Sequence, residues 1–530
     1  MIVVNDSEAN VAEQEQKGEM FHSYPHIIGL DHELFRLNDT PITDECQYNA
    51  LGRMETYLKV QNARMLGFQT NKGSYYSKKL SFMLDVNANN AGDPFVNGSY
   101  TMNTKIMERA VLDYFAHLWH AESPSNPANR ESYWGYVLSM GSTEGNLYAL
   151  YNAREYLKGK ILHREQNQQL PCIRSSEKDG HSANTYIPVA FFSEDTHYSV
   201  GKALRMLEIR TFFEIGEMEY KGQCPITSDG HWPKKVPCEN GNGGPGSVDV
   251  DKLIVLVEYF AQKGYPPLII LNVGTTFKGA YDDVEKVGNL LKPVLTRYKL
   301  HKRTINYTSG KSDERTGYWI HVDGALGASY LPFIEKARDR IKEHIPKFDF
   351  SLPFVHSIVT SAHKISGCPV PSGIYMTKHK YQITSYDNTE YIGSPDTTFA
   401  GSRNAIAPAA LWCYYASTSD EIESERAVQM QDMAKYAETK LKELDQESQH
   451  YGYNLWIARS PLSLSIIFRD PENEDIKRRY SLSEMKLQID DETEPRKYVH
   501  IYTMSSVTKK MIEELVEDLR REYKSKWMPK

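Results

Sequence analysis

Short apolar runs alternate with longer segments of helical periodicity through the middle of this chain. Between residues 106 and 119, apolar side chains recur every three or four positions, which predicts an amphipathic helix. Strands that alternate with helices are typical of βαβ units around a parallel sheet. We expect strands at residues 136–138, 187–192, 268–271, 319–322 and 357–360. Helices are expected from residue 143, near residue 200, and over residues 250–263 and 332–344. The pattern therefore predicts an α/β fold.

The two ends of the chain lack this alternation. The first 95 residues are polar and interrupted by Gly and Pro, with helical periodicity only around residues 45–66, and we interpret residues 1–95 as an N-terminal arm. Residues 96–412 then form a large domain. Residues 413–530 combine helices with strands, which predicts a smaller α+β domain. Its helices are expected at 421–444 and 508–524, and its strands at 453–458, 462–468 and 498–503.

Two stretches interrupt the alternating pattern, residues 229–248 and residues 304–315. The first contains a run of Gly and Asn residues, and the second contains several charged residues. We expect both to be surface insertions.

Composition excludes several classes of protein. The chain has 62 Lys and Arg against 69 Asp and Glu, a net charge of −7, and it lacks the basic surface of a nucleic-acid binder. No apolar run approaches the roughly 18 residues of a membrane span, and residues 1–6 turn acidic before a signal-peptide core could form. Six scattered cysteines without a Cys-x-x-Cys pair predict neither a disulfide framework nor a structural metal. We therefore expect a cytoplasmic protein without nucleic-acid or membrane partners.

Lys364 and Asp323 each follow an apolar strand. Burial lowers the pKa of a lysine, and a neutral amine can attack an aldehyde to form a Schiff base. A carboxylate at a strand end needs a cation or a donor, and a protonated pyridine nitrogen is one such partner. Taken alone, Lys364 also fits a surface lysine and Asp323 also fits a helix cap. One strand, a crossover helix and the next strand fit between them, which would place both side chains at the carboxyl edge of one sheet.

A turn of small residues before the helix that starts near residue 143 is a candidate anion site. Backbone N–H groups and the dipole at a helix start attract an anion, and the hydroxyls of Ser142 and Thr143 add donors. A plain helix cap is the alternative interpretation. The turn lacks the lysine of a P-loop and the full G-x-G-x-x-G spacing, so nucleotide binding is less attractive.

Two more strand ends carry polar residues. His197 follows the strand at 187–192, and its imidazole could stack on a flat ring, although a single histidine at a helix start is more often a structural residue. Asn272 and Thr275 follow the strand at 268–271 and could line the same sheet edge. Together, an anion-binding helix start, a ring-stacking His, a strand-end Asp and a strand-end Lys meet the separate needs of pyridoxal 5′-phosphate (PLP).

In this order the motifs resemble those of the group II PLP-dependent amino acid decarboxylases, closest to the bacterial-type histidine decarboxylase branch. The likeness runs from about residue 89 to residue 503. It is carried by residues 139–146, 193–203, 272–276, 321–325 and 361–364.

The resemblance implies a fold-type I PLP-dependent transferase architecture, with helices on both faces of the sheet, and decarboxylation of an L-amino acid to its amine. It implies that Lys364 forms the internal aldimine, that Asp323 pairs with the pyridine nitrogen, and that His197 stacks on the ring. Residues implied to serve the opposite ring face or the phosphate are Ala325, Ser142, Thr143, Ser361 and His363. A homodimer with active sites at the interface is also implied.

Residues 391–404 resemble the family's loop that covers the substrate and contacts the partner subunit. Gly393, Pro395 and Gly401 interrupt this segment, as expected for a mobile loop. Tyr391, Ser394 or His197 is expected to return the proton to Cα, and Ser402 is expected to contact the cofactor.

The sequence leaves several substrates and several reactions open. The two insertions are longer than in compact histidine enzymes, so histidine, a branched aliphatic amino acid, methionine and serine all stay open. The alternative reactions on the same cofactor are retro-aldol cleavage and oxidative deamination to an aldehyde. A non-catalytic binding protein is disfavoured because Lys364, Asp323 and His197 are all intact.

Overall fold

The computed structural model describes residues 27, 29–37, 39–72, 74, 76–162, 182–308, 310–383, 390–489 and 492–527. The chain divides into two compact units, one of residues 1–65 with 479–481 and the other of the remaining residues. In the first unit, helix α2 (Asp44–Arg64) confirms the periodicity predicted around residues 45–66. It starts where the Thr43 side chain accepts a hydrogen bond from the Cys46 N–H.

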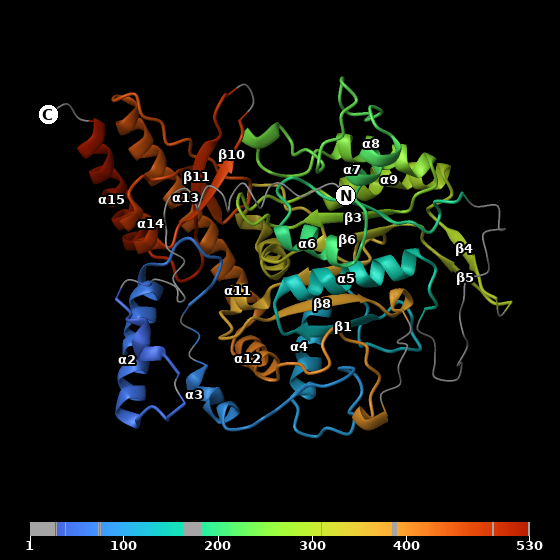
Figure 1. Cartoon of the computed structure of the whole chain (residues 1–530), viewed down its shortest axis with the longest axis horizontal. Coiled ribbons are helices and arrows are strands. Elements are labelled where there is room, and N and C mark those ends of the chain that lie inside the picture. Colours follow the sequence, from blue (N-terminus) through green and yellow to red (C-terminus); the bar gives the residue numbers. More distant parts are fainter. Residues whose placement is uncertain are drawn as a thin grey trace. The chain divides into compact units, whose positions relative to one another are not determined.

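A six-stranded sheet forms the centre of the second unit (Figure 1). Its strands lie in the order β1-β8-β7-β6-β3-β2. Their bounds are Tyr133–Leu138 (β1), Val189–Phe191 (β2), Pro267–Asn272 (β3), Trp319–Asp323 (β6), Ser357–Thr360 (β7) and Gly373–Lys378 (β8). β2, β3, β6 and β7 pair in parallel, whereas β8 pairs antiparallel with both β7 and β1. The mostly parallel sheet is confirmed, with β8 as a strand that the sequence did not predict.

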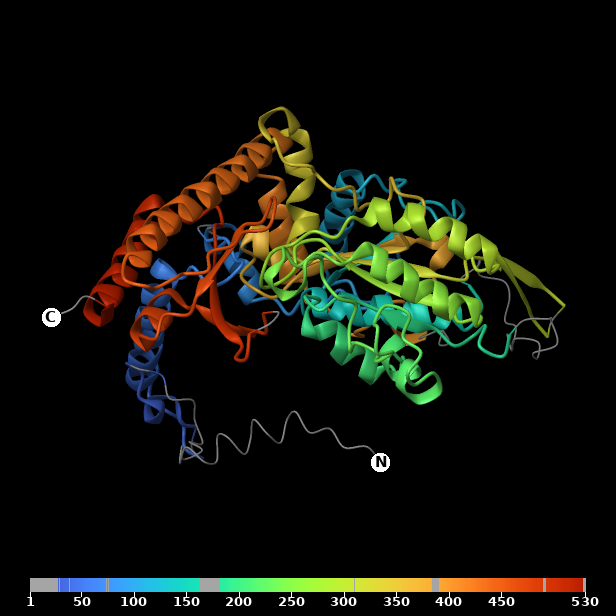
Figure 2. The ribbon, with the colours of Figure 1, turned by 90° about the horizontal axis from the view of Figure 1, so that it is seen from above.

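Helices cover both faces of this sheet (Figure 2). On one face, core side chains of β2 and β3 pack with those of α5 and α6. On the other face, Phe191 of β2 stacks on Phe212 of α7 and lies edge-on to Phe260 of α8. The bounds of these helices are Ser142–Leu157 (α5), Tyr198–Met206 (α6), Phe212–Glu219 (α7) and Val250–Gln262 (α8). The fold is therefore the α/β arrangement that the sequence predicted.

The expected crossover helix at 332–344 is shorter in the structure. Helix α10 (Leu331–Lys336) ends early, and the chain is extended again at Ile341. This change of direction buries Ile345 and Phe348, so tertiary packing overrides local helix propensity. Other helices of the second unit are α3 (Ser77–Leu80), α4 (Lys105–Leu118), α9 (Val284–Arg297), α11 (Ala362–Ser366) and α12 (Ile406–Tyr415).

Both expected surface insertions expose many of their side chains, as predicted, but each also buries several. Residues 304–315 lie in a β-hairpin of β4 (Arg303–Asn306) and β5 (Ser312–Arg315), and alternate side chains of it are buried. In the stretch 229–248, Trp232, Val236 and Cys238 are buried. These apolar residues pack against neighbouring elements. The high Gly and Asn content of the stretch does not reveal this burial.

The C-terminal residues combine helices with a three-stranded antiparallel sheet, β10-β11-β9. The elements are α13 (Asp420–Gln449), β9 (Ser465–Arg469), α14 (Glu474–Tyr480), β10 (Ser483–Leu487), β11 (Arg496–Tyr502) and α15 (Lys509–Trp527). The expected strand at 453–458 is wrong, because Trp456 has a positive φ of 52° and its N–H is bonded to the Asn454 side chain. The division at residues 95 and 412 stays a prediction. Among the described residues, no helix is long and apolar enough to span a membrane.

Candidate active site

The ends of three neighbouring strands place Asp323 and Lys364 at one edge of the central sheet. In the register of the sheet, Asp323 at the end of β6 lies between Asn272 of β3 and Val359 of β7. The chain leaves β7 through Ser361 and enters the short helix α11, which carries Lys364. The shared edge predicted from the spacing is thus confirmed.

The carboxylate of Asp323 is buried but has two donors. Its Oδ2 accepts a hydrogen bond from Asn146 Nδ2 at 2.8 Å, and its Oδ1 accepts one from the Ala325 N–H at 3.2 Å. Donors to a carboxylate favour its charged form. Asp323 is therefore suited to pair with a cationic ring nitrogen.

A chain of hydrogen bonds fixes which way the Asn146 amide points. Trp319 Nε1 donates to Ser357 Oγ at 3.0 Å, so the Ser357 hydroxyl is free to donate to His321 Nδ1 at 2.8 Å. His321 Nε2 then carries the proton and donates to Asn146 Oδ1 at 2.9 Å. Burial lowers the pKa of His321 to about 4, which keeps this imidazole neutral. The amide N–H groups of Asn146 consequently face Asp323.

His197 lies at the start of helix α6 and belongs to the same network. Its Nδ1 is 2.7 Å from Ser199 Oγ, and this hydroxyl also accepts a hydrogen bond from Asn146 Nδ2 at 3.3 Å. Burial lowers the pKa of His197, while the charge of Asp323 acts in the opposite direction. His197 is thus a neutral, partly exposed ring beside the buried carboxylate.

Lys364 is a partly buried lysine whose hydrogen-bond partner is uncharged. Its Nζ donates a hydrogen bond to Gln69 Oε1. Burial lowers the pKa of Lys364 to about 8, although Asp323 acts to raise it. The neutral amine that a nucleophile requires is therefore more abundant near neutral pH than it is for an ordinary lysine.

The orientation of Gln69 is also determined by its neighbours. Its Nε2 donates to the Thr276 carbonyl at 3.1 Å and to the Tyr502 hydroxyl at 2.5 Å. The Tyr502 hydroxyl in turn donates to the Thr276 carbonyl. The amide oxygen of Gln69 is thereby left to face Lys364.

Three of the four residues predicted to bind an anion lie together at the start of α5. The Ser142 N–H donates to Ser361 Oγ at 3.1 Å, and the two hydroxyl oxygens are 2.9 Å apart. Gly141 has a φ of 69°, and a Cβ built on it would lie 3.0 Å from Cε1 of His363. The absence of a side chain at Gly141 thus keeps the turn open, while the fourth residue, Thr143, is exposed one position further on.

Asn272 and Thr275 are buried in a neighbouring network. Asn272 Nδ2 donates to Thr196 Oγ1 at 2.9 Å and to Asp282 Oδ2 at 3.0 Å. Thr275 Oγ1 accepts a hydrogen bond from the Ala280 N–H at 3.0 Å. These contacts support the loop before His197, and a direct contact of Asn272 or Thr275 with a cofactor stays a prediction.

The candidates on residues 391–404 have different environments. The side chain of Tyr391 is 84% exposed. Ser394 is buried, and its hydroxyl accepts a hydrogen bond from the Asp93 N–H at 2.9 Å. Ser402 is exposed and accepts one from Asn89 Nδ2 at 3.0 Å. The structure records no contact of these three side chains with Lys364, and their roles in the reaction stay predictions.

Sequence reasoning assigned no role to Asn146, Gln69 or Tyr502. A signal for Asn146 was available, because it lies four residues after Ser142 and so on the same face of α5. Gln69 and Tyr502 come from regions far apart in the chain, and no local pattern connects either residue with Lys364. Together the edge offers an amine, a carboxylate with donors, a flat imidazole and the turn that is predicted to bind an anion.

Comparisons with known proteins give one consistent result. Residues 72–406 match the family described as "Pyridoxal-dependent decarboxylase conserved domain". A solved structure of L-methionine decarboxylase from Streptomyces sp.590 is 42% identical, with 93% of this chain and 98% of that chain covered and a TM-score of 0.86.

Curated relatives are more distant. Histidine decarboxylase from Solanum lycopersicum is 28% identical over 497 residues, which are 92% of this chain and 93% of the relative. Serine decarboxylase 2 from Oryza sativa is 28% identical, with 89% of this chain and 78% of the relative covered.

Proposed function

Because this chain belongs to the pyridoxal-dependent decarboxylases, we propose that its substrate is an L-amino acid with an uncharged side chain. As a member of this family, the chain is a PLP-dependent carboxy-lyase that acts on an amino acid. Methionine is the first candidate substrate, before histidine and serine. The single observation that carries the choice of methionine is the 42% identity to L-methionine decarboxylase, against 28% for the histidine and serine enzymes. The uncharged amide of Gln69 beside Lys364 supports it, because a neutral side chain needs no charged partner.

The residues at the sheet edge fit PLP. Ser142, Ser361 and His363 would hold the phosphate, since hydroxyls and a helix start meet there at a glycine that leaves the turn open. Asp323 would hold the proton on the ring nitrogen, because its carboxylate is already surrounded by donors. His197 and Ala325 would flank the two ring faces. When bound, PLP supplies a conjugated ring that accepts the electron pair left behind as CO2 departs.

Each residue of the site would have a separate role in the reaction. Lys364 supplies a neutral amine, which Gln69 orients through one hydrogen bond. Asn146 donates to Asp323 Oδ2 and so fixes the orientation of this carboxylate toward the ring nitrogen it would hold. His197 or Tyr391 would deliver a proton to Cα. Ser394 is a weaker candidate for that step, because its hydroxyl is already bonded to the backbone of Asp93.

We also propose that the enzyme works as a cytoplasmic homodimer without a membrane or nucleic-acid partner. The support is a set of large apolar side chains that are exposed in each unit of the single chain, more than scattered surface residues would explain. They are Tyr48, Leu51, Leu58 and Val60 in the first unit, and Phe82, Leu84, Met102 and Ile106 in the second. Light scattering should give twice the chain mass of 60.8 kDa, and a stable monomer with full activity would contradict the dimer.

The relatives named above are all decarboxylases, so retro-aldol cleavage and oxidative deamination are not favoured. The test is CO2 release by the PLP-loaded enzyme across the twenty common L-amino acids, with the amine identified by mass spectrometry. We expect methionine to give CO2 and 3-methylthiopropylamine in equal amounts. Release of CO2 from histidine or serine but not from methionine would overturn the substrate proposal.

A further inference from the structure

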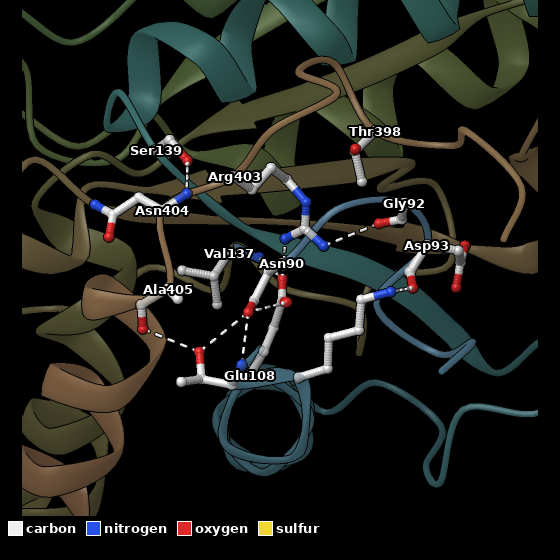
Figure 3. Close-up of polar contacts among 12 residues, drawn as sticks. Asn90, Gly92, Asp93, Glu108, Val137, Ser139, Thr398, Arg403, Asn404 and Ala405 are labelled. Atoms are coloured by element: carbon white, nitrogen blue, oxygen red, sulfur yellow. Dashed lines mark hydrogen bonds and ion pairs between the residues drawn. The ribbon is translucent and has the colours of Figure 1, made fainter. Parts of the chain in front are cut away.

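A buried ion pair links the segment 391–404 to the rest of the large domain. The Arg403 guanidinium donates to Glu108 of α4, and the two side chains are only 1% and 0% exposed. A second guanidinium nitrogen donates to the Gly92 carbonyl at 3.0 Å. Figure 3 shows Arg403 between Glu108 and Gly92. Arg403 is thus held from two sides, by a helix and by the segment that precedes it.

The Glu108 carboxylate has two further donors. Its Oε1 accepts a hydrogen bond from the Val137 N–H of β1 at 2.9 Å, and its Oε2 accepts one from Asn90 Nδ2 at 2.9 Å. One carboxylate therefore joins α4, β1, the segment around Asn90 and the segment of Arg403 (Figure 3). Val137 lies two residues before Ser139, where the anion-binding turn begins.

The backbone next to the ion pair continues to the anion-binding turn. The N–H of Asn404 donates to Ser139 Oγ at 3.1 Å. The N–H of Ser139 donates to Glu144 Oε2 at 2.7 Å, and Met140 donates to the same oxygen at 2.9 Å. Glu144 belongs to the first turn of α5, which also carries Ser142. The path from Arg403 to the candidate phosphate site therefore consists of two hydrogen bonds joined by short stretches of backbone.

Asp93 holds the other end of the same segment. Its Oδ2 accepts hydrogen bonds from the Thr397 hydroxyl at 2.6 Å and from Trp134 Nε1 at 3.1 Å. Between Thr397 and Arg403 lies a five-residue tip, residues 398–402, in which Phe399 and Ser402 are exposed. The tip is thus an exposed stretch between two buried attachments.

We propose that Glu108 and Arg403 are positioning residues that hold this tip and the anion-binding turn in one fixed geometry. Only the kcat measurement in the test of this inference rests on the proposed function. A buried ion pair is a poor source of net stability, because removing two charges from water offsets their attraction, so a specific geometry is the better explanation for it. The pair would act through Ser139 on the turn predicted to hold the cofactor's phosphate, and through the neighbouring Ser402 on the tip.

The hairpin β4–β5 offers a matched control. Arg315 and Asp313 form an ion pair that is equally buried, at 1% and 2% exposure. Arg315 bonds to the carbonyl of Tyr156 at the far end of α5. By the helical rise of about 1.5 Å per residue, this lies about 20 Å along α5 from Ser142. Loss of this pair removes the same kind of interaction without touching the turn or the tip.

The experiment compares E108Q and R403K with D313N and R315K. We expect E108Q and R403K to raise the dissociation constant for PLP about tenfold or more and to lower kcat, whereas the control variants lower only the melting temperature. The PLP dissociation constant, measured on the apoenzyme by fluorescence quenching, needs no substrate. It therefore tests this inference even if the assigned substrate is wrong.

A second variant covers the case in which loss of the ion pair prevents folding. S139A removes the acceptor for Asn404 and leaves Glu108 and Arg403 in place. We expect S139A to weaken PLP binding by several fold with little change in melting temperature. Unchanged PLP affinity and kcat in both S139A and E108Q, with a loss of stability equal to that of D313N, would overturn the proposal.

Discussion

The carboxyl edge of the central sheet and the segment 391–404 differ in how many of their polar side chains have hydrogen-bond partners within one chain. At the sheet edge, Asp323, Asn146 and His321 are buried, and each has hydrogen-bond partners within the chain. In the segment, buried attachments alternate with exposed side chains such as Tyr391 and Ser402. The groups predicted to carry the chemistry are therefore oriented before any ligand binds, whereas the segment predicted to cover the substrate is held only by attachments at a distance from its exposed side chains.

The largest expected effect comes from removing the amine at the sheet edge. Lys364→Ala should lower turnover by about 10³-fold or more, because the variant lacks the nucleophile. Lys364→Arg is the control, since it keeps a cation but offers no neutral amine. CO2 release and the absorbance of bound PLP measure the two effects. Multiple turnover at near-normal rate in Lys364→Ala would show that another residue carries the chemistry.

Two buried histidines of the same sheet allow a sharper test. His321 is connected to Asp323 through Asn146, whereas His356 bonds to Thr316 Oγ1 at 2.9 Å and to the Ile320 N–H at 3.1 Å, away from that carboxylate. We expect His321→Gln to lower kcat by about tenfold, because the Asn146 amide loses the hydrogen bond that orients it toward the Asp323 carboxylate. His356→Gln should lower stability with unchanged kcat.

To separate an effect on the orientation of Asn146 from an effect on folding, kcat of each histidine variant is divided by its folded fraction. Equal losses of kcat in His321→Gln and His356→Gln, in proportion to the folded fraction, would show that the chain of hydrogen bonds has only a structural role.

The lowered pKa of Lys364 predicts that the rate of PLP incorporation depends on pH, with an effect similar in size to that of His321→Gln. Burial lowers the pKa to about 8, so the protonated form dominates below that pH and the neutral amine above it. The rate at which apoenzyme incorporates PLP should rise about tenfold per pH unit below pH 8 and level off above it. A small amine with an ordinary lysine pKa is the control, and its rate should rise up to about pH 10. A level rate from pH 6.5 upward would contradict a titrating Lys364.

The smallest expected effects lie in the segment 391–404. Ser394→Ala should lower the free energy of unfolding by about 0.5–1 kcal/mol, because the Asp93 N–H loses one of its two acceptors and keeps the Pro395 carbonyl, with little change in kcat. Tyr391→Phe should leave stability unchanged, since the ring is exposed, and lowers kcat only if this hydroxyl delivers the proton. Denaturant unfolding and steady-state kinetics distinguish the two variants. A large loss of kcat in Ser394→Ala, with stability unchanged, would restore Ser394 as the proton donor.

Local pattern predicted the strand ends well, and with them Asp323 and Lys364. Apolar runs bounded by polar residues indicate where a buried strand stops, and parallel strands stop at the same edge. The same reasoning missed β8, the antiparallel strand, and the burial in the stretch 229–248. Those depend on which surfaces meet in the folded chain, and a local window carries no information about them.

The sequence by itself determined the α/β fold, the order of the motifs and the cofactor, because each of these follows from the periodicity and the types of neighbouring residues. Only the tertiary structure decided that Gln69 and Tyr502 meet at Lys364, and that Glu108 meets Arg403. These contacts join residues hundreds of positions apart. The physical reason is that a buried polar group must find its partner wherever the packed chain brings one, and that partner is set by the whole fold.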